Sequence, residues 1–227
     1  MQSLTELLIY NASQRKSTVF TKFFFAQERQ IHKGISLWGL TFFINSNYRR
    51  TSVMINELHL AMIKLYSGDA KRIQHFCKVH SYAKLIGETE NIDTKSLFIL
   101  EVAAITHDIG IHICEEKYGN CNGKNQEKEG PAIAEKLLKK LGFEDDVSER
   151  VQYLIAHHHT YNNIDGIDYQ ILIEADFLVN ILEEGLSKEA ALNAYNNIFK
   201  TECGKKLCKE MFSFFRRQYT IRHSLDA

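Results

Sequence analysis

Residues 102–110 are Val-Ala-Ala-Ile-Thr-His-Asp-Ile-Gly, an apolar run that ends in the adjacent pair His107-Asp108. Aspartate is almost never fully buried unless it is paired, yet Asp108 directly follows a segment with the composition of a helix core. An unpaired buried carboxylate is strongly destabilising, so it requires a cation or hydrogen-bond donors. The stretch therefore predicts a buried polar site, with a metal, a structural salt bridge or a helix cap as the three interpretations.

Two more candidate ligands lie on either side of this pair. His75 lies within a helical pattern upstream, and Asp176 lies within the apolar run 171–179 downstream. Two imidazoles and two carboxylates are a ligand set typical of Mn²⁺, Fe²⁺, Co²⁺ or Mg²⁺. Glu174 is two residues from Asp176 and is expected on a different face, toward solvent. The alternative for His75 is an ordinary core or surface histidine, and His80 is expected to be structural.

Three successive histidines, His157-His158-His159, close another amphipathic segment. Each residue of a helix advances by about 100°, so the three side chains cannot share one direction. His158 follows Leu154 by one turn and is the best inward candidate, with His157 next. Histidines are also favourable at a helix C-terminus through the helix dipole, which is the alternative interpretation.

The composition favours a helical protein. The chain has 227 residues, one proline and twelve glycines, which leaves long stretches free of helix breakers. Apolar residues recur at helical spacing and strand patterns are nearly absent, so the predicted fold is an all-α bundle. Asp69 is expected to cap a helix, and Gly87 to end it. Helices are expected at about 54–65, 70–86, 94–106, 131–141, 147–158, 169–182, 187–199 and 203–221.

The segment 110–130 interrupts this regular pattern with four glycines and several charges. A connection of this length in a compact domain is usually functional, so we expect a loop that closes over a ligand. Tyr118 is a candidate stacking platform within it. A solvated surface connection is the alternative.

The first 53 residues differ from the rest of the chain. The whole chain carries no net charge, but residues 1–53 hold seven Lys/Arg against two Asp/Glu. We predict a basic N-terminal extension or arm at 1–53 and a helical domain at 54–227. The balanced total charge argues against nucleic acid as a partner.

Cysteines and hydropathy suggest a location. The five cysteines form no C-x-x-C pair, which argues against a disulfide framework or a structural zinc site. No apolar run in the sequence reaches the ~20 residues that span a bilayer. We expect a cytoplasmic protein that needs no membrane, and the sequence leaves a homo-oligomer open.

Along the chain, the candidate residues follow the order His75, His107-Asp108, His157-His158-His159 and Asp176. In this order and in the sequence around the doublet, the chain resembles the HD-domain superfamily of metal-dependent phosphohydrolases. The matching segments cover about 54–185 and include Ala104 to Gly110 around the doublet. The resemblance implies a helical bundle with a central metal site and one set of four ligands: His75, His107, Asp108 and Asp176.

The same resemblance implies a second metal in some members of the family. His157 and His158 match two of its ligands, but a histidine expected near 126–130 is absent. This departure puts a stable second metal in doubt, with Glu127 or Glu129 as substitute oxygen ligands.

The implied activity is hydrolysis of a phosphate ester, of a nucleotide or a similar small molecule, by a metal-activated water. Asp108 would orient the water. Charge that develops on the phosphate needs cationic or hydrogen-bonding groups, for which we consider His112, Lys117, Lys124, the three-histidine run and Arg72. The alternatives are a non-catalytic regulatory module that binds metal or a nucleotide, and a di-iron oxygenase of the same superfamily.

Overall fold

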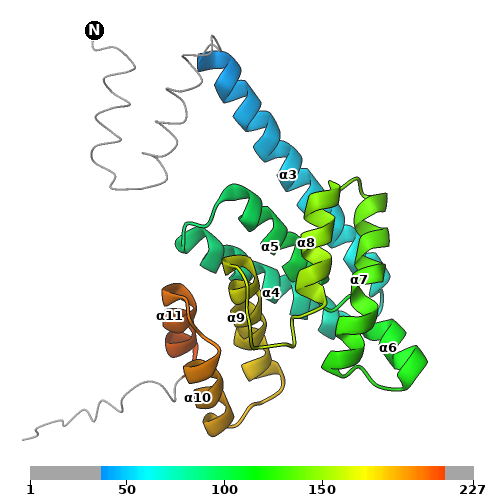
Figure 1. The fold of residues 1–227 in the computed structure, drawn as a ribbon, viewed down its shortest axis with the longest axis vertical. Coiled ribbons are helices and arrows are strands. Elements are labelled where there is room, and N and C mark those ends of the chain that lie inside the picture. Colours follow the sequence, from blue (N-terminus) through cyan, green and yellow to red (C-terminus); the bar gives the residue numbers. More distant parts are fainter. Residues whose placement is uncertain (1–36, 213–227) are drawn as a thin grey trace, which may run out of the picture. The chain divides into compact units, whose positions relative to one another are not determined.

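The computed structural model describes the backbone of residues 37–212 and the side chains of residues 49–212. This part of the chain contains only helices and connecting turns, which confirms the predicted all-α fold (Figure 1). The helices are α3 Leu37–Leu65, α4 Ala70–Thr89, α5 Thr94–Thr106, α6 Ile111–Tyr118, α7 Gly123–Lys140, α8 Asp145–Ile155, α9 Ile167–Glu183, α10 Lys188–Asn197 and α11 Glu202–Met211.

The chain divides into two units, Met1–Val53 and Met54–Ala227. Most of the first unit lies outside the described residues, so the basic arm and its boundary stay predictions. Within the second unit, the end of α3 contributes Leu58 and Met62 to the core, and the turn after it contributes Tyr66.

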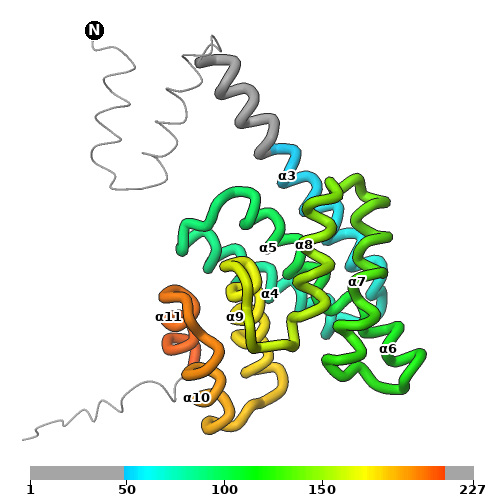
Figure 2. Tube along the Cα trace, viewed as in Figure 1, coloured from blue at the N-terminus to red at the C-terminus, as the bar shows by residue number. Residues whose placement is uncertain are grey.

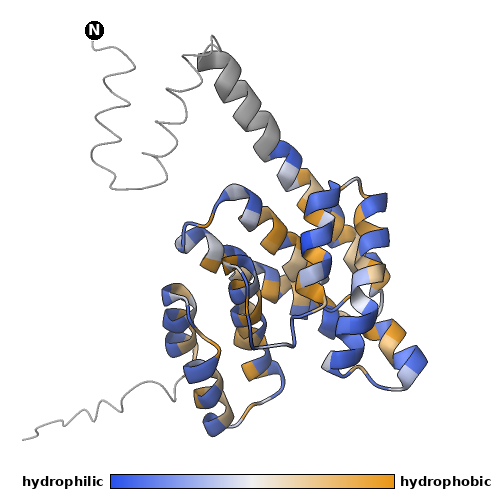
Figure 3. Ribbon diagram, in the orientation of Figure 1, coloured by the Kyte–Doolittle hydropathy of each residue, from blue (hydrophilic) through white to orange (hydrophobic). Residues whose placement is uncertain are grey.

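Helix α5 forms the centre of the second unit and packs against α4, α8 and α9 (Figure 1). Its residues from Ile99 to Thr106 are all buried, because the segment is apolar on every face and must be surrounded by other helices. Figure 2 traces the chain from α4 through α5 to the later helices that enclose it. Figure 3 shows hydrophobic residues where α4, α5, α8 and α9 meet, and hydrophilic residues on much of α7 and α10. Because His107 and Asp108 directly follow α5, they lie in the middle of the bundle.

The stretch Thr94–Tyr118 has the length and hydropathy of a membrane-spanning helix, but 72% of its apolar window is buried inside the protein. It consists of α5, the turn after it and α6. Its hydropathy is accounted for by its place in the core.

Helix ends follow local capping chemistry. The Asp69 carboxylate accepts a hydrogen bond from the Arg72 N–H at 3.1 Å, as the sequence predicts for the start of α4. Asp93 accepts from two backbone N–H groups at the start of α5. Helix α4 continues past Gly87 to Thr89, so the predicted end at that glycine is wrong. Leu97, Ile92 and Leu100 pack so tightly on Gly87 that a Cβ there would lie 2.8 Å from Leu97 Cδ1.

The loop predicted at 110–130 is wrong. The segment forms α6 and the first turns of α7, and Pro131 lies inside α7 rather than at its first turn. Two of its glycines allow close helix packing: a Cβ on Gly110 would lie 3.0 Å from the Gly130 nitrogen, and one on Gly130 would lie 2.6 Å from Ile155 Cγ2. Gly119 instead ends α6 with a left-handed backbone conformation. The glycine content of 110–130 therefore does not indicate a loop.

Candidate metal centre

Four side chains from three helices and one turn meet at the centre of the second unit. His75 comes from the middle of α4, His107 is the residue that ends α5, Asp108 lies in the turn after it, and Asp176 comes from α9. His75, His107 and Asp176 are 8%, 1% and 6% exposed. The four residues that the sequence singled out as ligands therefore converge.

The nitrogen and oxygen atoms in this group face one another closely. His75 Nε2 lies 3.2 Å from His107 Nε2, 3.2 Å from Asp176 Oδ1 and 3.5 Å from Asp108 Oδ2. His107 Nε2 lies 3.4 Å from Asp108 Oδ2 and 3.6 Å from Asp176 Oδ1. Atoms at such separations have the spacing of ligands around one ion with bonds of about 2 Å.

Each histidine is oriented by its other ring nitrogen. His75 Nδ1–H donates to Glu183 Oε2 at 2.9 Å, and His107 Nδ1–H donates to the Ala104 carbonyl at 3.0 Å. A carboxylate or carbonyl behind the ring fixes the tautomer with the Nε2 lone pair facing inward, as is usual for metal-binding histidines. The sequence analysis missed Glu183. Since it lies seven residues after Asp176 in α9, on the same helix face, that spacing could have indicated it.

The electrostatics of the group favour ionised carboxylates. Burial alone would raise the pKa of Asp108, but His107 and His158 outweigh it and hold the pKa well below the usual range. Burial alone would also raise the pKa of Asp176, which His107 and His75 lower. For His107, burial acts to lower the pKa, but Asp108 and Asp176 raise it well above its usual value. The Asp108 carboxylate is half-buried, the Asp176 carboxylate is buried, and both face His75 and His107. Such an arrangement requires compensating positive charge.

Several buried polar atoms of this group lack hydrogen bonds. Asp176 Oδ1, His158 Nε2, His159 Nε2 and Gln126 Oε1 have no hydrogen-bond partner among the described residues. Buried polar atoms are rarely left without one, and unpaired acceptor atoms that face carboxylates fit a divalent cation. The residues present thus suit the metal that the ligand set predicts.

A second cluster shares Asp108 with the first. Ligand atoms of Asp108, His158 and His159 lie within 4.8 Å of one another, and His158 Nε2 is 3.6 Å from Asp108 Oδ1. His158 Nδ1–H donates to the Ile155 carbonyl at 2.8 Å. Burial, with His158 beside it, lowers the pKa of His159 to about 4, so its ring is neutral at neutral pH, the form that binds metals.

His157 is not part of this cluster. Its Nδ1–H donates to the Tyr153 carbonyl at 2.7 Å, and its ring packs on the ring of Tyr153. Helix α8 ends at Ile155, so the three histidines follow turns rather than a helix. For this reason the rotation argument identified His158 but chose His157 over His159.

Within the segment 126–130, where a histidine was expected, Gln126 is 7% exposed and lines the cavity beside the candidate ligands. Its Nε2 donates to the Cys121 carbonyl at 2.7 Å, which leaves its Oε1 as the unpaired atom. Glu127 accepts instead from the His159 N–H and the Thr160 hydroxyl, and Glu129 binds Lys117 and Tyr118. Neither glutamate belongs to a group with metal-ligand spacing among the described residues.

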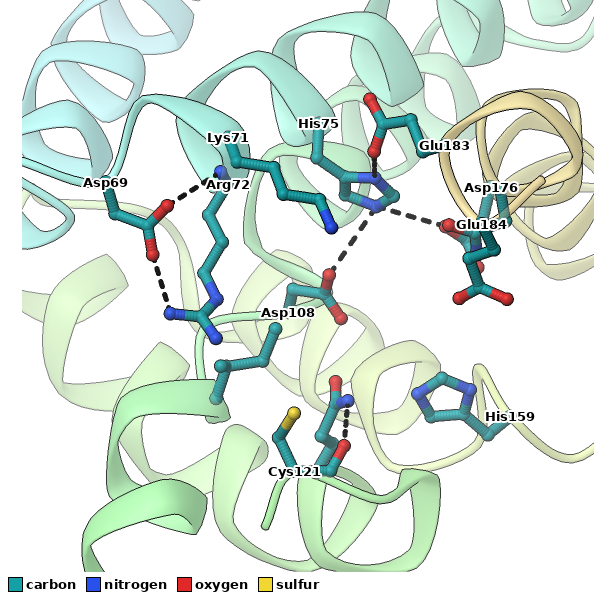
Figure 4. Close-up of a pocket in the computed structure, with 13 residues that line it drawn as sticks. Asp69, Lys71, Arg72, His75, Asp108, Cys121, His159, Asp176, Glu183 and Glu184 are labelled. Carbon is teal, nitrogen blue, oxygen red and sulfur yellow. Dashed lines mark hydrogen bonds and ion pairs between the residues drawn. The ribbon is translucent and has the colours of Figure 1, made fainter.

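A cavity of about 400 Å³ opens onto the ligands (Figure 4). It is lined by Asp69, Lys71, Arg72, His75, Asp108, Ile111, Cys121, Gln126, His159, Asp176, Asn180, Glu183 and Glu184. Its volume is at the small end of the range for ligand sites. Metal ligands and space for a small molecule thus occur together.

The structure places three predicted catalytic residues outside this lining. His112 packs its ring on Tyr66 at a centroid distance of 4.3 Å, Lys117 pairs with Glu129 at 2.5 Å, and Lys124 is exposed on α7. Tyr118, considered as a stacking platform, donates its hydroxyl to Glu129. These roles depended on a mobile loop over the site, and α6 and α7 hold the residues elsewhere.

Glu174 does not face solvent, so that prediction is wrong. It is 0% exposed, and it accepts hydrogen bonds from the N–H groups of Lys200 and Thr201 at 2.6 and 2.9 Å. The Thr201 hydroxyl and Gln170 also donate to it. Helix α11 covers the face of α9 that was expected to be exposed, and Glu174 anchors the turn that precedes α11.

Comparison with known proteins places this geometry in a family. No curated protein and no solved structure matches the chain. A family model described as HD domain matches residues 72–195, which include the four candidate ligands of the first cluster and more than half of the chain. The chain therefore belongs to the HD-domain family, whose members are mostly metal-dependent hydrolases.

Proposed function

We propose that this protein hydrolyses a phosphate ester, of a nucleotide or a similar small phosphorylated molecule, at a divalent metal held by His75, His107, Asp108 and Asp176. One observation carries the proposal: these four side chains converge, and three of them, His75, Asp108 and Asp176, line a cavity. The buried Asp176 Oδ1 has no hydrogen-bond partner among the described residues. When bound, a divalent metal would act as a Lewis acid and lower the pKa of a water molecule toward 7.

In the proposed reaction, water forms a new bond to phosphorus, the bond to the leaving oxygen breaks, and a proton goes to the departing alcohol. Asp108 has one oxygen facing His75 and His107 and the other facing His158. This carboxylate is therefore placed to accept a hydrogen bond from the attacking water and orient it. Glu183 acts as a positioning residue, because it holds the His75 ring.

The test is phosphate release from a panel of nucleotides and sugar phosphates, measured on metal-free protein supplied with Mn²⁺, Co²⁺, Fe²⁺ or Mg²⁺. We expect release that depends on the metal and disappears with a chelator. Tight metal binding without turnover of any substrate would instead support the non-catalytic module. Iron loading with oxygen uptake would support the oxygenase.

A further inference from the structure

Some of the positively charged side chains around the cavity form ion pairs with carboxylates of the protein, and others do not. Arg72 lines the cavity, but its guanidinium pairs with Asp69 at 2.6 Å and with Glu115 at 2.5 Å. Lys78, next to the cavity, pairs with Glu183 at 2.7 Å. Because these charges are compensated by the protein, they contribute little net attraction for an anionic ligand.

Lys71 differs from these residues. It lines the cavity and has no ion pair or hydrogen bond with any other residue of the described part of the chain. It lies four residues before His75 on α4, so the two side chains share a helix face. Figure 4 shows its side chain extending from α4 toward the space between His75 and Asp108. An uncompensated ammonium group thus points at the candidate metal centre.

Asn180 has the equivalent position on the helix opposite. It lies four residues after Asp176 on α9, it lines the same cavity, and its amide makes no hydrogen bond within the described residues. Helices α4 and α9 pack against each other. One turn away from a metal ligand on each helix, the structure therefore presents a free donor: an ammonium on α4 and an amide on α9.

The charge of the cavity explains why such donors matter. When the carboxylates that pair with an arginine or lysine are left out of the count, the negative charges of Asp108, Asp176 and Glu184 remain. The one positive charge left among the described residues of the lining is that of Lys71. A single divalent cation would only balance these charges, so an anionic ligand gains little from the cavity as a whole. Its affinity then depends on donors aimed at it directly, because hydrogen bonds to charged groups are the strong ones.

From this geometry we infer that Lys71 and Asn180 form the phosphate-binding site of the protein. They bind the non-reacting phosphate oxygens of a compact phosphomonoester, with Lys71 supplying the charge. This inference rests on the proposed function, and it assigns to Lys71 the part that the sequence analysis gave to Lys117 and Lys124.

The experiment is calorimetric titration of inorganic phosphate into the full-length, Mn²⁺-loaded protein. The variants are Lys71→Gln, Lys71→Arg and Asn180→Ala, and Lys136→Gln is the matched control, because it removes an exposed positive charge from α7 outside the cavity lining. We expect phosphate affinity to fall about tenfold in Lys71→Gln and about threefold to tenfold in Asn180→Ala. Lys71→Arg should retain affinity within about threefold, since it keeps the charge.

Mn²⁺ affinity measured on the same samples separates the outcomes. Unchanged Mn²⁺ affinity with weaker phosphate binding in Lys71→Gln supports the inference. Phosphate affinity that is equal in wild type, Lys71→Gln and Lys136→Gln would overturn it, as would a Mn²⁺-loaded wild type that does not bind phosphate. A protein that binds phosphate through Lys71 but hydrolyses no ester would refute the proposed function and leave this site standing.

Discussion

At the scale of single residues, the orientation of each central histidine ring depends on the hydrogen bond that its Nδ1–H donates. Glu183 and the carbonyl groups of Ala104 and Ile155 each accept a hydrogen bond from a histidine Nδ1–H, so Nε2 of each ring faces the centre. Glu183 is the one side chain among these three acceptors, and it also pairs with Lys78. It is therefore the acceptor that a substitution can remove.

Glu183→Gln should weaken metal binding by about 10- to 100-fold, because loss of the partner behind a metal-binding histidine has effects of that size. The measurement is competition for Mn²⁺ against a chelating dye. Glu116→Gln on exposed α6 is the control and should bind Mn²⁺ as the wild type does. Equal affinities for all three proteins would show that Glu183 does not position His75.

Gln126→His should increase the number of Mn²⁺ ions bound per chain at a given free concentration. The buried amide oxygen of Gln126 is unpaired and lies in the same cavity lining as His159, and imidazole is a better ligand for transition metals. Electron paramagnetic resonance of free Mn²⁺ gives the bound number directly. A stoichiometry identical to that of the wild type would argue against a second cation position beside His158 and His159.

The convergence of His75, His107, Asp108 and Asp176 could be predicted from residue types and order alone. A carboxylate after an apolar run requires compensation, and this argument applied to both Asp108 and Asp176. It failed for Glu174, whose compensation comes from the backbone of Lys200 and Thr201, far along the chain. The separate argument from helix rotation selected His158 but chose His157 over His159, since the end of α8 at Ile155 depends on how the helix packs.

At the scale of helices, glycine was the source of the main error. In 110–130 the pattern of glycines and charges suggested a loop, but Gly110 and Gly130 allow α6, α7 and α8 to approach closely. Composition does not distinguish a flexible glycine from one that permits close packing. By contrast, long apolar segments such as α5 and α9 were identified correctly, because few structures other than a buried helix accommodate them.

The docking of α11 on α9 gives a prediction for stability. Glu174→Ala removes the acceptor for the Lys200 and Thr201 N–H groups, and the buried Thr201 N–H and hydroxyl lose this partner. We expect the free energy of unfolding to fall by about 2–4 kcal/mol. Glu189→Ala, on exposed α10, should change it by less than about 0.5 kcal/mol.

Chemical denaturation followed by circular dichroism measures both changes. If Glu174→Ala unfolds at the same denaturant concentration as the wild type, the contact between Glu174 and the turn before α11 does not stabilise the protein.

At the scale of the whole molecule, the candidate metal centre joins the consecutive helices α4 and α5 to α9, which is distant from them in sequence but packs against both. A ligand that binds only the folded state stabilises it by mass action. Mn²⁺ at 100 times its Kd should therefore raise the free energy of unfolding by about 2.7 kcal/mol. Thermal unfolding with and without Mn²⁺ measures the effect, and a Tm that does not respond to Mn²⁺ would contradict binding to the folded protein.

Asp108→Ala tests the central claim most directly. Metal content, by elemental analysis, and phosphate release should be measured on this variant and on the wild type, purified identically, with circular dichroism to check the fold. Because Asp108 faces both histidine clusters, we predict that the folded variant loses both its divalent metal and its activity. A variant that keeps its metal and its turnover would contradict the proposed site.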